Sequence, residues 1–308
     1  MLEPSRVARF CARFAKQLAN LSLLSTPGEA SDAVGDAAEG EPQRIQREHF
    51  DWWAENEKQS YAAYQSTPFW MAADAAAFRG WQRRIKPDSW ALDLGCADGR
   101  SSFQFVRLVG QVTVVGFDVS RVMVSKAIER ARSAGVMGRT AFFVADAHAP
   151  PLQDLSFDYV LTYGVLHHFP DPARTCREIQ RLLKEGGTHF GSENNKSLLR
   201  GIFDLLMRLR PLWIEEAGKE PLISKEMIRA WVKGFPVGVQ YKTSVFLPPH
   251  LFNLVGPRIA KPLLAHTDRL FSALPGLRNH GGLLVFEITK RLLSPDAPRP
   301  TGDIAHTP

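Results

Sequence analysis

Two acidic residues stand inside a glycine-containing loop in the stretch ALDLGCADGR, residues 91–100. An apolar run delivers Asp93, and Gly95, Asp98 and Gly99 follow it. This spacing departs from the G-x-G-x-x-G fingerprint of dinucleotide-binding loops, and the Gly-Lys-Ser/Thr ending of a P-loop is absent. A phosphate beside two carboxylates would meet like charge at short range. The loop therefore indicates a ligand that carries positive charge near it, which disfavours a NAD-type enzyme.

Two more acids end the next two strand-like runs, Asp118 in VVGFD and Asp146 in FFVAD. S-adenosylmethionine (SAM) has an ammonium, a sulfonium and no phosphate, and its parts match the three acids in order. We expect Asp93 to accept hydrogen bonds from the ammonium, Asp118 from the ribose hydroxyls and Asp146 from the exocyclic amine of adenine. Glycines let the loop backbone approach the methionine portion without a clashing Cβ.

Short apolar runs alternate with amphipathic segments from residue 89 onward. This alternation predicts strands joined by helices, which build a parallel sheet covered on both faces. Ligands of such sheets bind beyond the carboxyl ends of the strands, where the three acids fall. The last two strands, at 237–247 and 281–290, are predicted to pair as an antiparallel edge. We therefore expect a Rossmann-like, doubly wound α/β fold with a mostly parallel seven-stranded sheet, an antiparallel C-terminal edge and helical insertions.

Four stretches stand out as a set: ALDLGCADG, VVGFDVS, FFVADAHAPPLQDLSFDYVLTYGVLHHFPDP and CREIQRLLKEGG. Together they resemble class I SAM-dependent methyltransferases, and specifically the small-molecule group called methyltransferase type 11, which includes ubiquinone and menaquinone biosynthesis enzymes. The resemblance covers residues 45–195 and continues as a generic match through the closing strand GGLLVFEITK. It implies SAM as the cofactor and methyl transfer as the activity, and it leaves the acceptor open.

The resemblance also implies which residues contact each part of the cofactor. Many relatives carry a second glycine where this chain has Ala97-Asp98. The implied contacts are Asp93, Gly95, Gly99 and the backbone of Cys96 and Ala97 for the methionine end, Asp118 for the ribose, Val119, Asp146 and the Ala147 amide for the adenine, and Tyr163 for the methyl group.

Methyl transfer from a sulfonium is an in-line displacement, so holding the reacting atoms in line supplies much of the catalysis. A general base is needed only where the acceptor must lose a proton. His167 and His168, after the fourth strand, and Glu193, after the fifth, are the candidate bases. A structural role is the favoured interpretation of each, with Asp171 as the N-cap of the next helix. No acid or cysteine stands at metal-ligand spacing, so no metal is expected.

The chain has 308 residues, of which 44% are hydrophobic, enough for one large domain with appendages. Its formal net charge of +6 is interpreted as spread along the chain, and no RNA-binding module is recognisable, so no nucleic acid partner is expected. Three distant cysteines, Cys11, Cys96 and Cys176, favour a reducing compartment. The expected location is the cytoplasm, or the mitochondrial matrix if the basic N-terminal helix is a targeting peptide.

The chain is expected to divide into four parts. An aromatic-rich helical segment, 49–85, precedes the first strand and could cap a pocket, although most of its rings are expected in the core. The four parts are an amphipathic N-terminal helix (1–25), a disordered linker (26–44), a methyltransferase domain (45–292) with helical substrate-cover insertions at 197–234 and 248–278, and a disordered tail (293–308).

The expected function is transfer of a methyl group from SAM to an O or C atom of a small, hydrophobic acceptor of aromatic, isoprenoid or lipid-linked type. The insertion at 197–234 combines a wide apolar face with arginines, which favours a cover for such an acceptor and contact with a membrane surface. One alternative is a non-catalytic SAM-binding assembly factor. The other is an RNA or protein methyltransferase, although TYGV after the fourth strand lacks the Asn/Asp-Pro-Pro-Tyr/Phe motif of amino-methylating nucleic-acid enzymes. The oligomeric state is left open.

Overall fold

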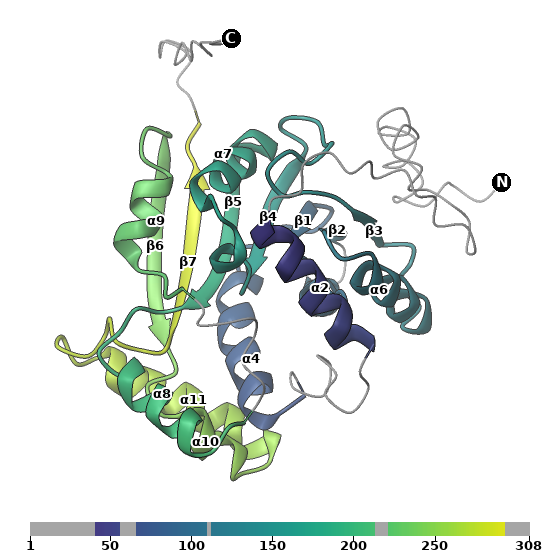
Figure 1. The fold of residues 1–308 in the computed structure, drawn as a ribbon. Coiled ribbons are helices and arrows are strands. Elements are labelled where there is room, and N and C mark those ends of the chain that lie inside the picture. The colour runs from purple at the N-terminus through teal and green to yellow at the C-terminus, as the bar shows by residue number, and fades with distance from the viewer. Residues whose placement is uncertain (1–40, 56–65, 110–111, 213–220, 293–308) are drawn as a thin grey trace.

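The computed structural model describes residues 41–55, 66–109, 112–212 and 221–292 (Figure 1). The N-terminal helix expected at 1–25 and the tail expected at 293–308 lie outside these residues, as does the expected linker up to residue 40. Helix α2 (Glu41–Glu55) begins inside the expected linker, so the last four residues of that segment are helical rather than disordered.

The seven strands are β1 (Trp90–Leu94), β2 (Thr113–Asp118), β3 (Thr140–Val144), β4 (Phe157–Tyr163), β5 (Leu183–Asn194), β6 (Val237–Ser244) and β7 (Leu283–Lys290). They form one sheet in the order β3-β2-β1-β4-β5-β7-β6. Strands β1 to β5 run parallel, and β7 is antiparallel to both of its neighbours, β5 and β6. The expected sheet and its antiparallel C-terminal edge are confirmed, and within that edge β7 lies between β5 and β6, with β6 outermost.

The side chains of β1 alternate between two hydrophobic layers, because successive residues of a strand point to opposite faces of a sheet. Leu92 and Leu94 pack with α7 (Pro172–Leu182) in one layer. Ala91 packs with α4 (Pro68–Gln82) and α5 (Arg100–Val109) in the other. Asp93 has the same parity as Ala91, so its carboxylate is directed toward α5.

Two short polar side chains begin helices that follow strands. The Ser120 hydroxyl accepts a hydrogen bond from the Met123 amide at 3.0 Å and caps α6 (Arg121–Ser133). The Asp171 carboxylate accepts from the Arg174 amide at 2.9 Å at the start of α7, as expected from the sequence. Both caps satisfy amides that a helix N-terminus leaves without an internal partner.

The helical insertions gather at the edge of the sheet where the parallel strands end (Figure 1). Helix α8 (Arg200–Leu209) follows β5, and α10 (Pro249–Asn253) and α11 (Pro257–Ser272) lie between β6 and β7. Helix α9 (Lys225–Trp231) also belongs to the expected cover at 197–234. It packs instead against α7 and β7 through a buried cluster, so it covers the sheet rather than the ligand edge.

Candidate active site

Asp93 is buried at the end of β1, with one carboxylate oxygen bound and the other without a partner. Oδ2 accepts hydrogen bonds from the Ser101 hydroxyl at 2.7 Å and the Ser102 hydroxyl at 2.6 Å. Oδ1 is buried and has no hydrogen-bond partner among the described residues. Burial raises the pKa of Asp93 to about 6, against the opposing effect of the two hydroxyls. A cationic donor at Oδ1 would offset this cost, so Asp93 fits the ammonium of SAM.

The loop after β1 has three residues with left-handed backbone. They are Gly95 (φ +69°), Ala97 (φ +44°) and Gly99 (φ +81°). A Cβ on Gly95 would lie 2.2 Å from a methyl group of Val165, so this position also requires glycine for space. Ala97 has the conformation that glycine adopts most readily, at the place where many relatives carry their second glycine.

The amides of this loop are hydrogen-bonded to β2. Gly95 and Cys96 donate to the Phe117 carbonyl at 2.9 and 3.0 Å, and Ala97 donates to Asp118 Oδ2 at 2.9 Å. The expected backbone contact of Cys96 and Ala97 with the methionine end stays a prediction, but the amides of both residues are already used inside the protein. The Cys96 side chain is buried in the core below the loop. Only carbonyl or van der Waals contact with the cofactor remains at these two positions.

Asp98, the second acid of the loop, forms an ion pair with Arg130 of α6. Its carboxylate is buried, and burial raises its pKa while Arg130 opposes that rise. The pair leaves little net charge at this point of the loop. The electrostatic case for a cationic ligand therefore rests on Asp93 rather than on both loop acids.

Asp118 lies at the end of β2 on the wall of a cleft. Its Oδ1 accepts from the Ser120 amide at 2.9 Å, in addition to the bond from Ala97 at Oδ2. Burial raises its pKa, and these amides oppose the rise. Each carboxylate oxygen retains a second lone pair, so the group can still accept from ribose hydroxyls.

The cleft brings together most of the residues expected to contact the nucleoside. Asp146 forms part of its wall and is half exposed, with Oδ1 accepting from the His148 amide at 2.9 Å. Helix α2 closes one side through Phe50, and Asp51 of the same helix is hydrogen-bonded to the Ser120 hydroxyl. The expected cap before the first strand therefore exists. The predicted residues that line this cleft are Gly95, Ala97, Asp118, Val119, Asp146, Ala147, Tyr163 and His168.

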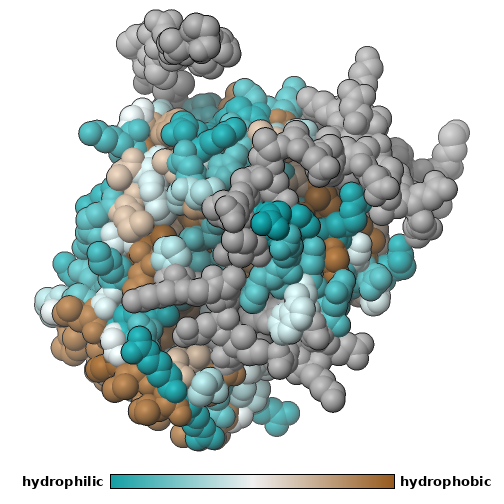
Figure 2. All heavy atoms as spheres, in the orientation of Figure 1, coloured by the Kyte–Doolittle hydropathy of each residue, from teal (hydrophilic) through white to brown (hydrophobic). Residues whose placement is uncertain are grey.

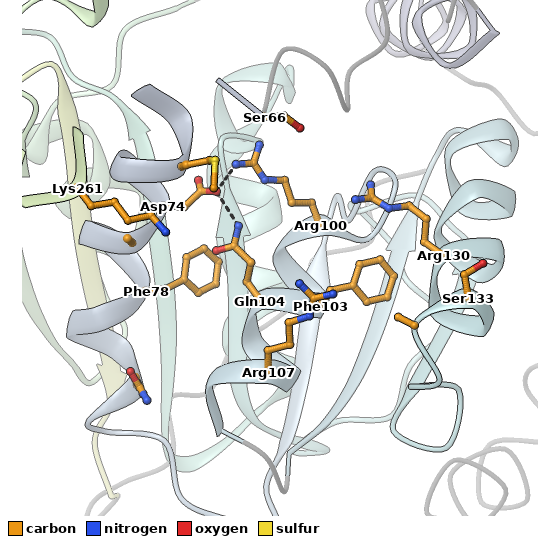
Figure 3. A pocket seen from close by; sticks show the side chains of 14 residues that line it. Ser66, Asp74, Phe78, Arg100, Phe103, Gln104, Arg107, Arg130, Ser133 and Lys261 are labelled. Carbon is orange, nitrogen blue, oxygen red and sulfur yellow. Dashed lines mark hydrogen bonds and ion pairs between the residues drawn. The ribbon is translucent and has the colours of Figure 1, made fainter. Parts of the chain in front are cut away.

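Tyr163 belongs to a buried polar network that the sequence analysis did not find. Its hydroxyl donates to Asp74 Oδ1 at 2.5 Å, and Gln104 donates to Asp74 Oδ2 at 2.6 Å. Arg100 forms an ion pair with the same carboxylate. Figure 3 shows Arg100 and Gln104 of α5 pointing toward Asp74 of α4. The available signal was an acid on the buried side of the alanine-rich helix MAADAAAF.

The three candidate bases have different surroundings. His167 and Glu193 are both buried, with His167 Nδ1 lying 2.6 Å from Glu193 Oε2. Glu193 Oε1 accepts from the amides of Val165 and Leu166 at 3.1 and 2.8 Å, which ties β5 to the turn after β4. His168 instead lines the cleft and meets the Phe50 ring edge-on at 5.5 Å. Their catalytic roles stay predictions, and His168 is the candidate that reaches the ligand side.

A larger cavity of about 870 Å³ lies between α4, α5, α6 and α11 (Figure 3). It shares Phe78, Arg100 and Gln104 with a small pocket beside the glycine loop. Arg107 and Lys261 also line it and form no ion pair with a described acid. The cavity thus adjoins the expected methionine end and has a cationic wall.

The described residues hold neither a metal-binding cluster nor a membrane-spanning helix. No group of three or more His, Cys, Asp or Glu side chains is arranged there to hold a metal ion. Among the helices that the structure describes, none combines the length and hydrophobicity that crossing a bilayer requires.

The fold and the site together have the features expected of a class I, SAM-dependent methyltransferase domain. The sheet order places β1, β2 and β3 side by side, and an acid lies within two residues of the carboxyl end of each: Asp93, Asp118 and Asp146. Residues 85–207, which are less than half of the chain, match the family model described as methyltransferase domain. The expected family resemblance is thereby confirmed.

Two curated relatives each match about a third of the chain. The 27-O-demethylrifamycin SV methyltransferase of Amycolatopsis mediterranei is 38% identical over 96 residues, 31% of this chain and 35% of that protein. The ubiquinone/menaquinone biosynthesis C-methyltransferase UbiE of Escherichia coli is 32% identical over 116 residues, 37% of this chain and 46% of that protein. The match therefore spans less than half the length of each of these relatives.

A solved structure shows the fold over a longer range. It is a complex between the Trm112 methyltransferase activator of Haloferax volcanii and a methyltransferase, with a TM-score of 0.55 and 19% identity. The alignment covers 81% of this chain and 99% of that one. The similarity of fold to this solved structure thus extends beyond residues 85–207.

Proposed function

We propose that this chain transfers a methyl group from SAM to an O or C atom of a small, hydrophobic acceptor. The observation that carries the proposal is the buried Oδ1 of Asp93, which has no hydrogen-bond partner among the described residues and lies beside the glycine loop, on the strand next to the one that ends at Asp118. A dinucleotide phosphate would meet like charge at the buried carboxylate of Asp93, whereas an ammonium would meet opposite charge there. The proposal for O or C as the methylated atom is supported by the relatives named above, which are named for 27-O-demethylrifamycin SV and for C-methylation.

Different residues of this chain would bind the cofactor, exclude water and accept a proton. SAM, when bound, supplies a methyl group on a positively charged sulfur. Asp93 would hold the ammonium, Asp118 the ribose and Asp146 the adenine edge, and α2 would exclude water from the cleft through Phe50. His168 lines the cleft, and it would accept a proton from an acceptor hydroxyl.

The test is calorimetric titration of the full chain with SAM, with NAD as the control ligand. We expect micromolar SAM binding and no NAD binding. Transfer of the methyl group is then assayed with labelled SAM and a panel of quinones, phenols and lipid extracts. Absence of SAM binding by folded protein would contradict the proposal. SAM binding without transfer to any acceptor would instead favour the non-catalytic assembly factor.

A further inference from the structure

Large exposed apolar side chains are concentrated on α8, α10 and α11. The described residues include 13 exposed large hydrophobic side chains, and nine of them lie between residues 198 and 274. Figure 2 shows these hydrophobic residues gathered at the lower left, over the three helices. We call them the apolar face: Leu198, Ile202, Leu205, Leu209, Leu251, Leu254, Ile259, Leu270 and Leu274.

The apolar face is not the side by which these helices pack on the domain. Phe203 of α8, Phe252 of α10 and Leu264 of α11 fill that inner side and are buried against α4. The outer stripe of α8 is separate, because Leu198 and Leu209 are 80% and 74% exposed. Because α8 is apolar on both sides, we expect a second apolar surface to bind its outer side.

The charge of the segments that carry the apolar face indicates the chemistry of the surface that would bind it. Segments 197–212 and 248–280 contain seven Lys or Arg and only two acids, so most of the chain's formal net charge of +6 falls in them. The charge is therefore not spread along the chain, contrary to the expectation from composition. Asp204 is ion-paired with Arg200, and Asp268 is hydrogen-bonded to Ser244 and the Val245 amide. Neither acid offsets the remaining cations.

Apolar side chains among unpaired cations match the surface of an anionic bilayer, which offers both a hydrocarbon layer and negative headgroups. Arg208, Arg210, Arg258 and Arg269 form no ion pair with a described acid. A second copy of the chain would instead bring like charge against like charge, which disfavours self-association through this face.

The position of the apolar face relates it to the site. Helix α8 begins just after β5 ends, and α10 and α11 lie between the end of β6 and the start of β7. This is the edge at which Asp93, Asp118 and Asp146 end their strands. A bilayer on the apolar face would therefore lie beside the carboxyl edge of the sheet and its ligand cleft.

From these observations we infer that the apolar face docks the protein on the surface of an anionic membrane, from which the active site takes an acceptor held in the bilayer. The part about the acceptor rests on the proposed methyl transfer. The docking itself does not, since it depends on α8, α10 and α11 alone.

The experiment is co-sedimentation of the full chain with phosphatidylcholine vesicles, with and without phosphatidylglycerol. We expect binding to the anionic vesicles that weakens with added salt. The triple variant Leu198→Ser, Leu209→Ser and Leu254→Ser should bind at least about tenfold more weakly, because three apolar anchors are lost. The matched control, Leu155→Ser with Leu292→Ser, changes exposed leucines outside the face and should bind like the natural chain.

Two readouts separate the possible failures. SAM affinity of the triple variant should equal that of the natural chain, which shows that the domain is folded and keeps docking separate from the proposed function. Unchanged vesicle binding by the triple variant, or no vesicle binding by the natural chain, would overturn the inference. The inference would also be overturned if the natural chain formed a dimer without lipid and the triple variant did not. The apolar face would then bind a second copy of the chain.

Discussion

The amide of Ala97 donates a hydrogen bond to the Asp118 carboxylate at 2.9 Å, which ties the glycine loop after β1 to the end of β2. The methionine side and the ribose side of the expected cofactor site are therefore not independent. A change at Asp118 alters the loop as well as the direct ribose contact.

Asp118→Ala should weaken SAM binding by about 1.5–3 kcal/mol, because a charge-assisted acceptor is lost together with the loop tether. Calorimetric titration measures the change. The control is Asp154→Ala, which removes an exposed acid paired with Arg181 far from the cleft. SAM affinity of Asp118→Ala equal to that of the natural chain would contradict the ribose role.

SAM affinity should fall as the pH falls through about 6, the value to which burial raises the pKa of Asp93. Protonated Asp93 cannot attract an ammonium, so affinity should drop about tenfold per pH unit below that value. Without ligand the sign is reversed: the folded-state pKa exceeds the ordinary 3.8, so stability declines as the pH rises through this range. Titrations from about pH 7.5 to about pH 5 test this, and Asp93→Asn should bind weakly without the pH dependence.

Ala97→Gly should raise the free energy of unfolding by up to about 1 kcal/mol, because Ala97 has a positive φ that disfavours a Cβ. Denaturant unfolding measures the effect. Ala134→Gly is the control, since Ala134 has a right-handed backbone and its change to glycine should be destabilising by about 0.5–1 kcal/mol. Destabilisation by both variants would show that the loop does not strain Ala97.

Asp74→Ala should destabilise the fold by about 3–5 kcal/mol, because Arg100 and Tyr163 would lose a shared buried partner. Thermal or denaturant unfolding gives the value. Asp154→Ala again serves as the comparison, with an expected cost of about 1 kcal/mol or less for an exposed pair. Similar effects of the two changes would mean that the Asp74 network contributes no more than a surface ion pair.

His167→Ala should mainly lower stability, whereas His168→Ala should mainly lower turnover. His167→Ala removes the side chain that lies beside Glu193 Oε2 and leaves this buried oxygen without it. The change should cost about 1.5–3 kcal/mol of stability. For an acceptor that must lose a proton, His168→Ala should lower kcat by about 10²–10⁴-fold while changing stability little. Steady-state kinetics and unfolding are measured on both variants. Unchanged kcat in His168→Ala would exclude it as the base.

The local pattern was sufficient for the sheet and for the acids that end its strands. Strand and helix periodicity placed β1 to β5, and Asp93, Asp118 and Asp146 fell at the expected ends because each acid directly follows or ends an apolar run. Such signals involve neighbours in sequence, which is why they can be read without a structure.

Contacts between distant segments were not predictable in the same way. Asp74 lies 89 positions before Tyr163, and the alanine-rich helix gives no sign of which strand it will meet. The use of the Cys96 and Ala97 amides by β2 was also missed, because hydrogen bonds across strands depend on register. The apolar face was anticipated only for α8, since α10 and α11 join it through the fold.

The place of β7 in the sheet has a consequence for the order of events during synthesis. β7 lies between β5 and β6, and within the described sheet it is the strand that joins β6 to the rest. Until residues 283–290 leave the ribosome, β5 has an open edge and β6 has no strand to pair with. The β1–β5 part can form earlier, but completion of the sheet has to wait for residues 283–290. Chaperone protection of that exposed edge would matter most in this interval.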